Sequence, residues 1–123
     1  MPISYAVDKH RDFVLVTWKG DVTGEEYRAH LIAMLQDPDA LRAGRSLTDL
    51  RQANVLASGA ELNAIGSAEA VPRLAGRPWR NAVLVSSTVN YGVARQYQIF
   101  SGSEGSDDVF RDYDAALAWL LTE

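Results

Sequence analysis

The residues best suited to chemistry follow two short strand-like segments, residues 46–50 and the apolar run 82–85. In open α/β sheets, ligands and functional side chains gather beyond the carboxyl ends of the strands. We therefore expect a ligand or partner surface formed by the polar residues that follow these segments, namely Asp49, Arg51, Ser58 and Ser87. The alternative is that these side chains only terminate strands and cap helices.

A second group of residues is suited to binding an apolar molecule. Leu62 and Ile65 lie at helical spacing behind Ser58, and Tyr91 follows the apolar run 82–85. Trp79 stands in the Gly/Pro-punctuated segment 73–80, between proline and arginine. Aromatic side chains beside arginine are favoured at binding surfaces. A tryptophan that closes the end of the sheet is an equal alternative.

Other chemistries have weak support. The chain has two histidines and no cysteine, which excludes a thiolate zinc site and a cysteine nucleophile. Glu26 and His30 are four residues apart, and we interpret them as a solvated pair on a helix face. The sequence contains no Gly-x-Ser-x-Gly elbow, no Walker loop and no Gly-x-Gly-x-x-Gly motif. We therefore expect no enzyme activity, no metal and no cofactor.

Composition narrows the class of protein further. The chain has 123 residues, 47% hydrophobic and 23% charged, which is typical of one globular domain over residues 1–123. Its net charge of −4 gives no general footprint for nucleic acid. Six arginines and three carboxylates nevertheless give residues 42–80 a net charge of +3. We interpret this charge in two ways: the arginines simply lie at loop ends, or they form one positive edge that meets an anionic ligand or an acidic partner. With no apolar run long enough to span a membrane and no leader-like start, we expect a cytoplasmic protein.

The hydrophobic pattern predicts the elements that must position these residues. Residues 3–7 and 13–18 read as strands joined by a polar turn, followed by strands at 46–50, 82–85 and 109–110. Thr23 and Glu26 form a capping box before a helix that should stop before Pro38. Ser58 and Glu61 repeat the box before a helix that should end at Pro72. Further helices should cover residues 89–100 and follow Asp112.

The predicted order is ββαβαβαβα, with four helices. Strands that alternate with helices favour right-handed crossovers and a parallel sheet. We therefore predict an α/β fold: one mixed, mostly parallel five-stranded sheet with an N-terminal antiparallel hairpin.

The chain resembles the SpoIIAA-like, or STAS, domains of the anti-sigma-factor antagonists, closest to an uncharacterised bacterial branch related to lipid-binding CRAL-TRIO domains. The resemblance covers nearly the whole chain. It is carried by four segments, Gly20–Thr23, Leu47–Leu50, Val93–Tyr97 and, as the most specific, Val109–Leu120.

The resemblance implies a phosphorylation site. STAS antagonists are phosphorylated on a serine in an Asp-Ser-Ser/Thr-Gly motif at the start of the helix after the third strand. Ala57-Ser58-Gly59 falls at the matching place, with alanine for the aspartate and one hydroxyl residue missing. Ser58 is thus a candidate phosphoacceptor, with an ordinary helix cap as the alternative.

The resemblance also suggests a function. We expect a non-enzymatic regulatory or protein-binding module that contacts a protein partner or forms a homodimer. The alternative is binding of a small apolar or lipid-like ligand between the 58–71 helix and the sheet.

Overall fold

The protein is built on one mixed sheet of five strands. The computed structural model describes residues 2–101 and 107–122, and of residues 99–101 the backbone alone. The strands run in the order β1-β2-β3-β4-β5 across the sheet. Their bounds are β1 Ile3–Asp8, β2 Phe13–Val22, β3 Arg45–Val55, β4 Arg80–Leu84 and β5 Asp107–Phe110. β1 is antiparallel to β2 and every other neighbouring pair is parallel, as the sequence predicted.

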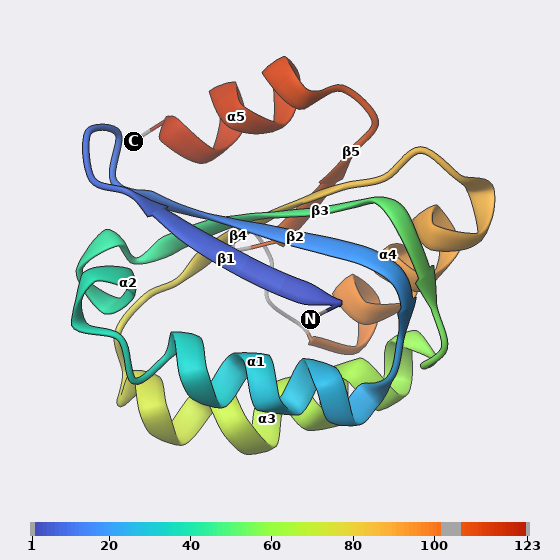
Figure 1. The fold of residues 1–123 in the computed structure, drawn as a ribbon, viewed down its shortest axis with the longest axis horizontal. Helices are drawn as coiled ribbons and strands as arrows, with labels where there is room; N and C mark the ends of the chain where they lie inside the picture. Colours follow the sequence, from blue (N-terminus) through green and yellow to red (C-terminus); the bar gives the residue numbers. More distant parts are fainter. Residues whose placement is uncertain (1, 102–106, 123) are drawn as a thin grey trace.

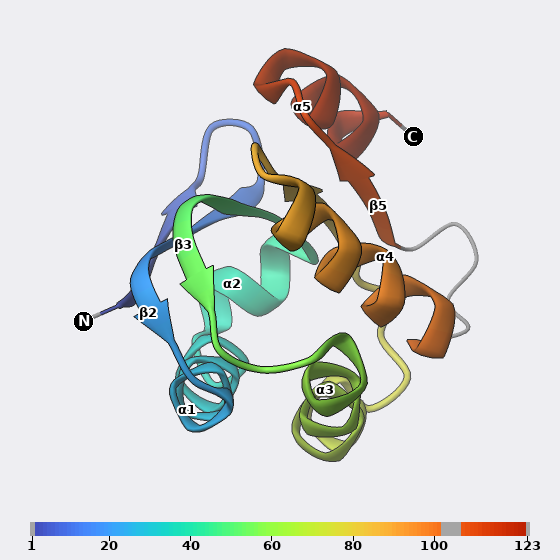
Figure 2. The same ribbon diagram turned by 90° about the vertical axis from the view of Figure 1, so that its right-hand side faces the viewer.

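Helices cover the two faces of the sheet unequally (Figures 1 and 2). Their bounds are α1 Gly24–Met34, α2 Pro38–Ala43, α3 Gly59–Leu74, α4 Thr88–Ser101 and α5 Tyr113–Leu121. Helices α1, α3 and α4 pack on one face, around a core that contains Val16, Trp18 and Leu50. Helix α5 packs on the other face, against Leu47, Ala82 and Leu84.

The fifth helix, α2, corrects the predicted number of four. Helix α1 ends at Met34, before Pro38 as predicted. Pro38 itself occupies the first turn of α2. Proline suits that position because its missing N–H would have no helical partner there. Asp37 caps the new helix by accepting from the backbone nitrogen of Asp39, and Gly44 ends it in the left-handed conformation.

The predicted end of α3 at Pro72 is also wrong. The helix continues to Leu74, and Ala75 closes it with a positive φ of 51°. A proline removes a single backbone donor, and Pro72 lies exposed in the last turn. In the next position, the Arg73 side chain donates to the carbonyl oxygen of Glu69 at 2.9 Å, which supports this turn.

Strands β2 and β3 extend beyond their predicted ends and curl together toward the helical layer (Figure 1). The register shifts where Leu50 and Arg51 of β3 oppose the single residue Trp18 of β2. Such a bulge bends the strands and changes where side chains point. Buried Asn90 of α4 holds the bend, since its Nδ2 donates to the carbonyl oxygens of Leu50 at 3.1 Å and Ala53 at 3.0 Å.

Candidate functional site

The residues at the carboxyl end of β3 bond chiefly to one another. Both oxygens of Asp49 accept from Arg51, whose Nε and Nη2 each lie 3.0 Å away. Hydrogen bonding with Asp49 raises the pKa of Arg51. The Arg51 guanidinium also lies 6.0 Å from the ring centroid of Tyr113 in α5. This pair is therefore occupied by local contacts, on the face of the sheet that α5 covers.

The two serines that precede helices act as caps. Ser58 is exposed, and its Oγ accepts from the backbone nitrogen of Glu61 at 3.1 Å. Its capping box is half formed, because the Glu61 carboxylate approaches Gly24 of α1 instead of returning to Ser58. Ser87 accepts in the same way from the nitrogen of Asn90 at 3.0 Å. Phosphorylation of Ser58 stays a prediction.

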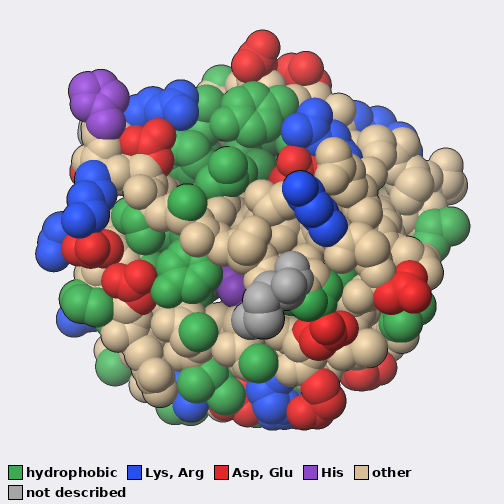
Figure 3. All heavy atoms as spheres, in the orientation of Figure 1, with side chains coloured by type: hydrophobic (Ala, Val, Ile, Leu, Met, Phe, Trp, Pro, Cys, Tyr) green, Lys and Arg blue, Asp and Glu red, His purple; other side chains and the backbone are tan. Residues whose placement is uncertain are grey.

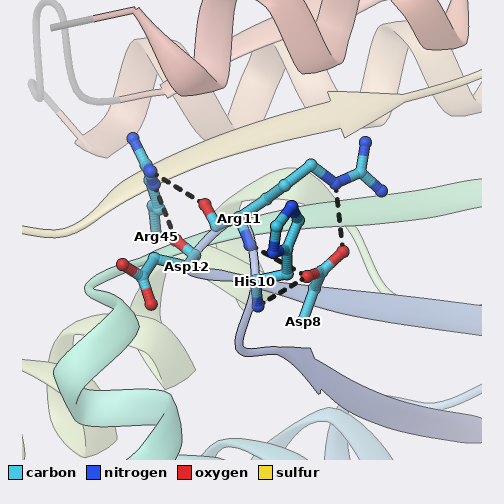
Figure 4. Close-up of polar contacts among 5 residues, drawn as sticks. All are labelled: Asp8, His10, Arg11, Asp12 and Arg45. Carbon is cyan, nitrogen blue, oxygen red and sulfur yellow. Dashed lines mark hydrogen bonds and ion pairs between the residues drawn. The ribbon is translucent and has the colours of Figure 1, made fainter.

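Five of the six arginines of residues 42–80 have side chains that form hydrogen bonds or ion pairs within the described part of the protein. Arg45 donates to the carbonyl oxygens of Asp12 at 2.7 Å and Arg11 at 3.0 Å, which ties β3 to the β1–β2 turn (Figure 4). Arg80 donates to the Trp119 carbonyl and stacks 4.2 Å from its ring centroid, at the end of α5. Arg42 pairs with a carboxylate, as do Arg51 and Arg73. These contacts favour a structural role for most of this positive segment.

A cavity of about 260 Å³ lies between the sheet and helices α1 and α3. Its floor comes from the amino-terminal half of β3 and from neighbouring positions of β2 and β4. Gly66, Ser67 and Ala70 of α3 line it from above. These side chains are too small to fill the space between the helix and the sheet. A smaller cavity of about 60 Å³ shares Trp18 and Tyr97 with the first.

The floor of this cavity carries a polar network on an otherwise apolar face. The Oδ1 atom of Asn81 accepts from Ser46 Oγ at 2.8 Å and from Thr48 Oγ1 at 2.9 Å. Ser46 Oγ in turn accepts from Trp79 Nε1 at 3.0 Å. These four side chains fall on the same face because Ser46 pairs with Asn81 across β3 and β4, and alternate residues share a face.

His30 lines the same cavity from α1, which corrects its interpretation as half of a solvated pair. Glu26 belongs to the capping box and bonds to Thr23, so it does not pair with the imidazole. The His30 ring packs edge-on against Tyr5, with 5.8 Å between the centroids. Burial lowers the pKa of His30 to about 4, so the imidazole is neutral at neutral pH.

Two tyrosines close the cavity on the side of α4. Burial raises the pKa of Tyr27 well above its ordinary value, and a hydrogen bond with Tyr97 adds to this effect. Burial, with the nearby Asp107 charge, also raises the pKa of Tyr97. Trp18 packs on Tyr27 at 5.5 Å, and its Nε1 is the one buried side-chain polar atom of the described residues without a hydrogen bond.

The residues predicted to bind an apolar molecule do not line one common cavity. Trp79 lines the large cavity and Leu62 the small one. Ile65 is buried in the helix–sheet core outside both. Tyr91 is half-buried at the other end of the sheet, where the guanidiniums of Arg111 and Arg95 lie 4.8 Å and 6.0 Å from its ring centroid.

The residues of the cavity floor were not predicted from the sequence as site residues. Ser46, Thr48 and Asn81 are polar residues at alternate positions of central strands, where the face that meets a helix is normally apolar. That interruption was the available signal. It identifies the face but not the hollow, which depends on the small residues of α3 opposite.

The described part of the chain has neither a metal-binding cluster nor a membrane-spanning helix. Residues 2–101 and 107–122 contain no group of three or more His, Asp or Glu placed to hold a metal ion. Within the same ranges, no helix has the length and apolarity needed to cross a membrane.

Comparison with known proteins gives matches of structure alone. No family model matches the sequence, and no curated protein is significantly similar to it. An uncharacterised protein of the DUF3478 family from Shewanella loihica PV-4, described as having a SpoIIAA-like fold, superposes with a TM-score of 0.59. It is 18% identical, over 96% of this chain and 93% of that one.

The anti-sigma factor antagonist SpoIIAA in its unphosphorylated form is also similar. It superposes with a TM-score of 0.55 at 8% identity, over 94% of each chain. Both matches span nearly the full length of both partners, and the mixed, mostly parallel five-stranded sheet agrees with the predicted fold class. This chain therefore has the SpoIIAA-like fold of the STAS domains.

Proposed function

We propose that this chain is a non-enzymatic module of the STAS type that binds a small, mostly apolar molecule in the cavity between α1, α3 and the sheet. The observation that carries the proposal is the cavity itself, about 260 Å³ in a chain of 123 residues. Protein interiors are otherwise close-packed, with few voids larger than a water molecule. A non-enzymatic role is supported by the polar residues that precede α3 and α4, which cap helices rather than form a nucleophile–base pair.

The size and lining suit a compact ligand. A cavity of about 150 Å³ holds benzene, so by proportion this one accommodates roughly ten non-hydrogen atoms. Apolar walls come from Leu31, Met34 and Leu74, and Trp79 adds an aromatic edge. Walls of this kind with a few polar groups are typical of small-molecule sites.

Binding can be tested with cumene, an apolar probe of suitable size. We expect saturable chemical-shift changes in two-dimensional NMR spectra of the full chain, confined to residues that line the cavity. Ala70→Leu should abolish them, because Ala70 lines the cavity and the larger side chain fills it. Ala68→Leu is the matched control, since Ala68 lies exposed on the same helix. Failure of cumene to saturate the unaltered protein would overturn the proposal.

Contact with another protein is a second candidate, which a separate observation favours. Helix α5 lies mainly over β3, β4 and β5 and shares a core with Phe13 at the start of β2, so this face of the sheet is least covered over β1. Ala6 is exposed there and Leu15 is half-buried. Figure 3 displays hydrophobic side chains gathered over this part of the surface. An apolar patch on a surface is a common mark of a protein interface.

Sedimentation velocity tests the case in which the partner is a second copy. We expect the unaltered chain to form a dimer, and Ala6→Glu to return it to a monomer by placing a charge on this face. Ala68→Glu, on exposed α3, should leave the dimer intact. A monomer at every concentration of the unaltered chain contradicts self-association.

A further inference from the structure

The charges around the cavity restrict what it can hold. Among the described residues that line it, none is lysine or arginine, and Asp107 is the one carboxylate. The arginines of α1 and α3 are engaged elsewhere: Arg28 and Arg73 both bond to the carboxylate of Glu69, with Arg73 Nη1 at 2.8 Å. An anion in the cavity would therefore find no cation among these described residues to replace the hydration that it loses.

The other titratable groups of the lining are uncharged at neutral pH. His30 is neutral because burial lowers its pKa to about 4. Tyr27 and Tyr97 are neutral as phenols ordinarily are at this pH, and burial raises the pKa of each further. The described lining of the cavity therefore offers hydrogen-bonding groups and no positive charge.

The polar floor presents a donor to the cavity. Asn81 uses its Oδ1 atom for the hydroxyls of Ser46 and Thr48, and its Nδ2 donates in none of the hydrogen bonds among the described residues. A side-chain amide nitrogen carries two N–H donors. Asn81 lines both the large and the small cavity, so this amide lies where the two meet the sheet.

We infer that the ligand is an uncharged molecule with an apolar body and a hydrogen-bond acceptor, such as a ketone, ester or amide oxygen, which accepts from Asn81 Nδ2. This inference rests on the proposed function, since it names the class of ligand for the same cavity. The apolar body packs against the walls of α1 and α3, and the acceptor lies on the floor between β3 and β4. A carboxylate of the same size should bind more weakly, because no cation in the described lining compensates its charge.

Three probes of equal size separate these alternatives: cumene is apolar, acetophenone carries a neutral acceptor and benzoate carries a negative charge. Titrations at neutral pH, followed by NMR, should give acetophenone an affinity at least about tenfold higher than that of benzoate. Benzoate binding as tightly as acetophenone would overturn the inference. If cumene also fails to bind, the proposed function is wrong as well. If cumene binds and acetophenone has no advantage over benzoate, the inference alone fails.

A variant and a direct spectroscopic reading test the role of Asn81. Asn81→Leu should weaken acetophenone by about fivefold to tenfold, the equivalent of one hydrogen bond, and leave cumene within about twofold. Asn54→Leu is the matched control, because Asn54 is an exposed asparagine of β3 that lies outside both cavities. An equal loss of acetophenone in both variants contradicts the assignment.

The unaltered protein gives the second reading, which stands if Asn81→Leu does not fold. The side-chain amide protons of Asn81 should move downfield when acetophenone binds and not when cumene binds. Saturation by acetophenone without a selective shift of these protons overturns the assignment of Asn81 as the donor.

Discussion

Protonation of His30 should destabilise the fold in a defined range of pH. Burial lowers its pKa from 6.5 to about 4 in the folded protein, so the unfolded chain binds the proton more readily. The free energy of unfolding therefore has its full value above the pKa of His30 in the unfolded chain. It decreases as the pH falls from there toward the pKa of His30 in the folded protein. With these two values, linkage gives a loss of about 2 kcal/mol between about pH 7.5 and pH 5.

Urea unfolding of the unaltered chain, measured at several pH values in this range, tests the reasoning. Carboxylates with lowered pKa, such as Glu69 and Asp37, lose their contribution only at lower pH and so do not interfere. His30→Gln should remove most of the dependence, because it has no titrating group at this position. His10→Gln is the matched control, since His10 is exposed in the β1–β2 turn. An unchanged slope in His30→Gln, or an NMR titration of the His30 ring centred near pH 6.5, would refute the argument.

Two further predictions concern how the helices hold the sheet. Asn90→Ala should cost about 2 kcal/mol in urea unfolding, since it removes two hydrogen bonds from buried carbonyls at the bend of β3; a loss below about 0.5 kcal/mol contradicts this role. Gly59→Ala should destabilise by about 1–3 kcal/mol, because its Cβ would lie 2.7 Å from the Val93 oxygen of α4. Gly92→Ala has open space around it and should stabilise by up to about 1 kcal/mol, so equal effects of the two glycine substitutions in thermal unfolding would refute the packing argument.

The sheet was predictable because each strand carries its own pattern. Alternation along the segment 46–50 places Leu47 and Leu50 on opposite faces, and they lie in the two separate cores. The parallel relation of β3 and β4 followed from the helix between them, and the structure confirms it. These features depend on local periodicity and on the handedness of crossovers, which any βαβ unit obeys.

Features that depend on contacts distant in sequence were not predictable in the same way. The extension of β3 to Val55 exists because β2 extends beside it, with Val22 paired to Val55. Continuation of α3 past Pro72 is supported by Arg73, whose side chain bonds back to Glu69. Proline and glycine signals mark where an element can end, but the neighbouring element decides whether it does.

The candidate site illustrates the same division. The rule for open α/β sheets directs attention to the carboxyl ends of the strands, yet the cavity lies over the amino-terminal half of β3 and beside Asn81 of β4. At the carboxyl ends, Asn90 and Ser86 bond to the carbonyls of the β3 bend and so hold the fold. The sequence shows where polar residues lie. Whether such a residue stabilises the fold or lines a binding site depends on the helix or strand that packs opposite it.

The cavity exists because the side chains of α3 that face the sheet are small and the floor opposite them is polar. The space of about 260 Å³ is partly open to the surface, so water can enter it, and it costs less stability than an enclosed dry void of the same size. Larger apolar residues at Ala70 and Thr48 would close it, so the sequence retains a space that a more stable core would fill. The hydroxyl and amide groups of the floor bond to one another, and polar groups of this kind favour a hydrated pocket over a dry one. A ligand that replaces the water and accepts from Asn81 would recover stability in proportion to its binding, and the melting temperature of the chain should therefore rise with acetophenone more than with benzoate.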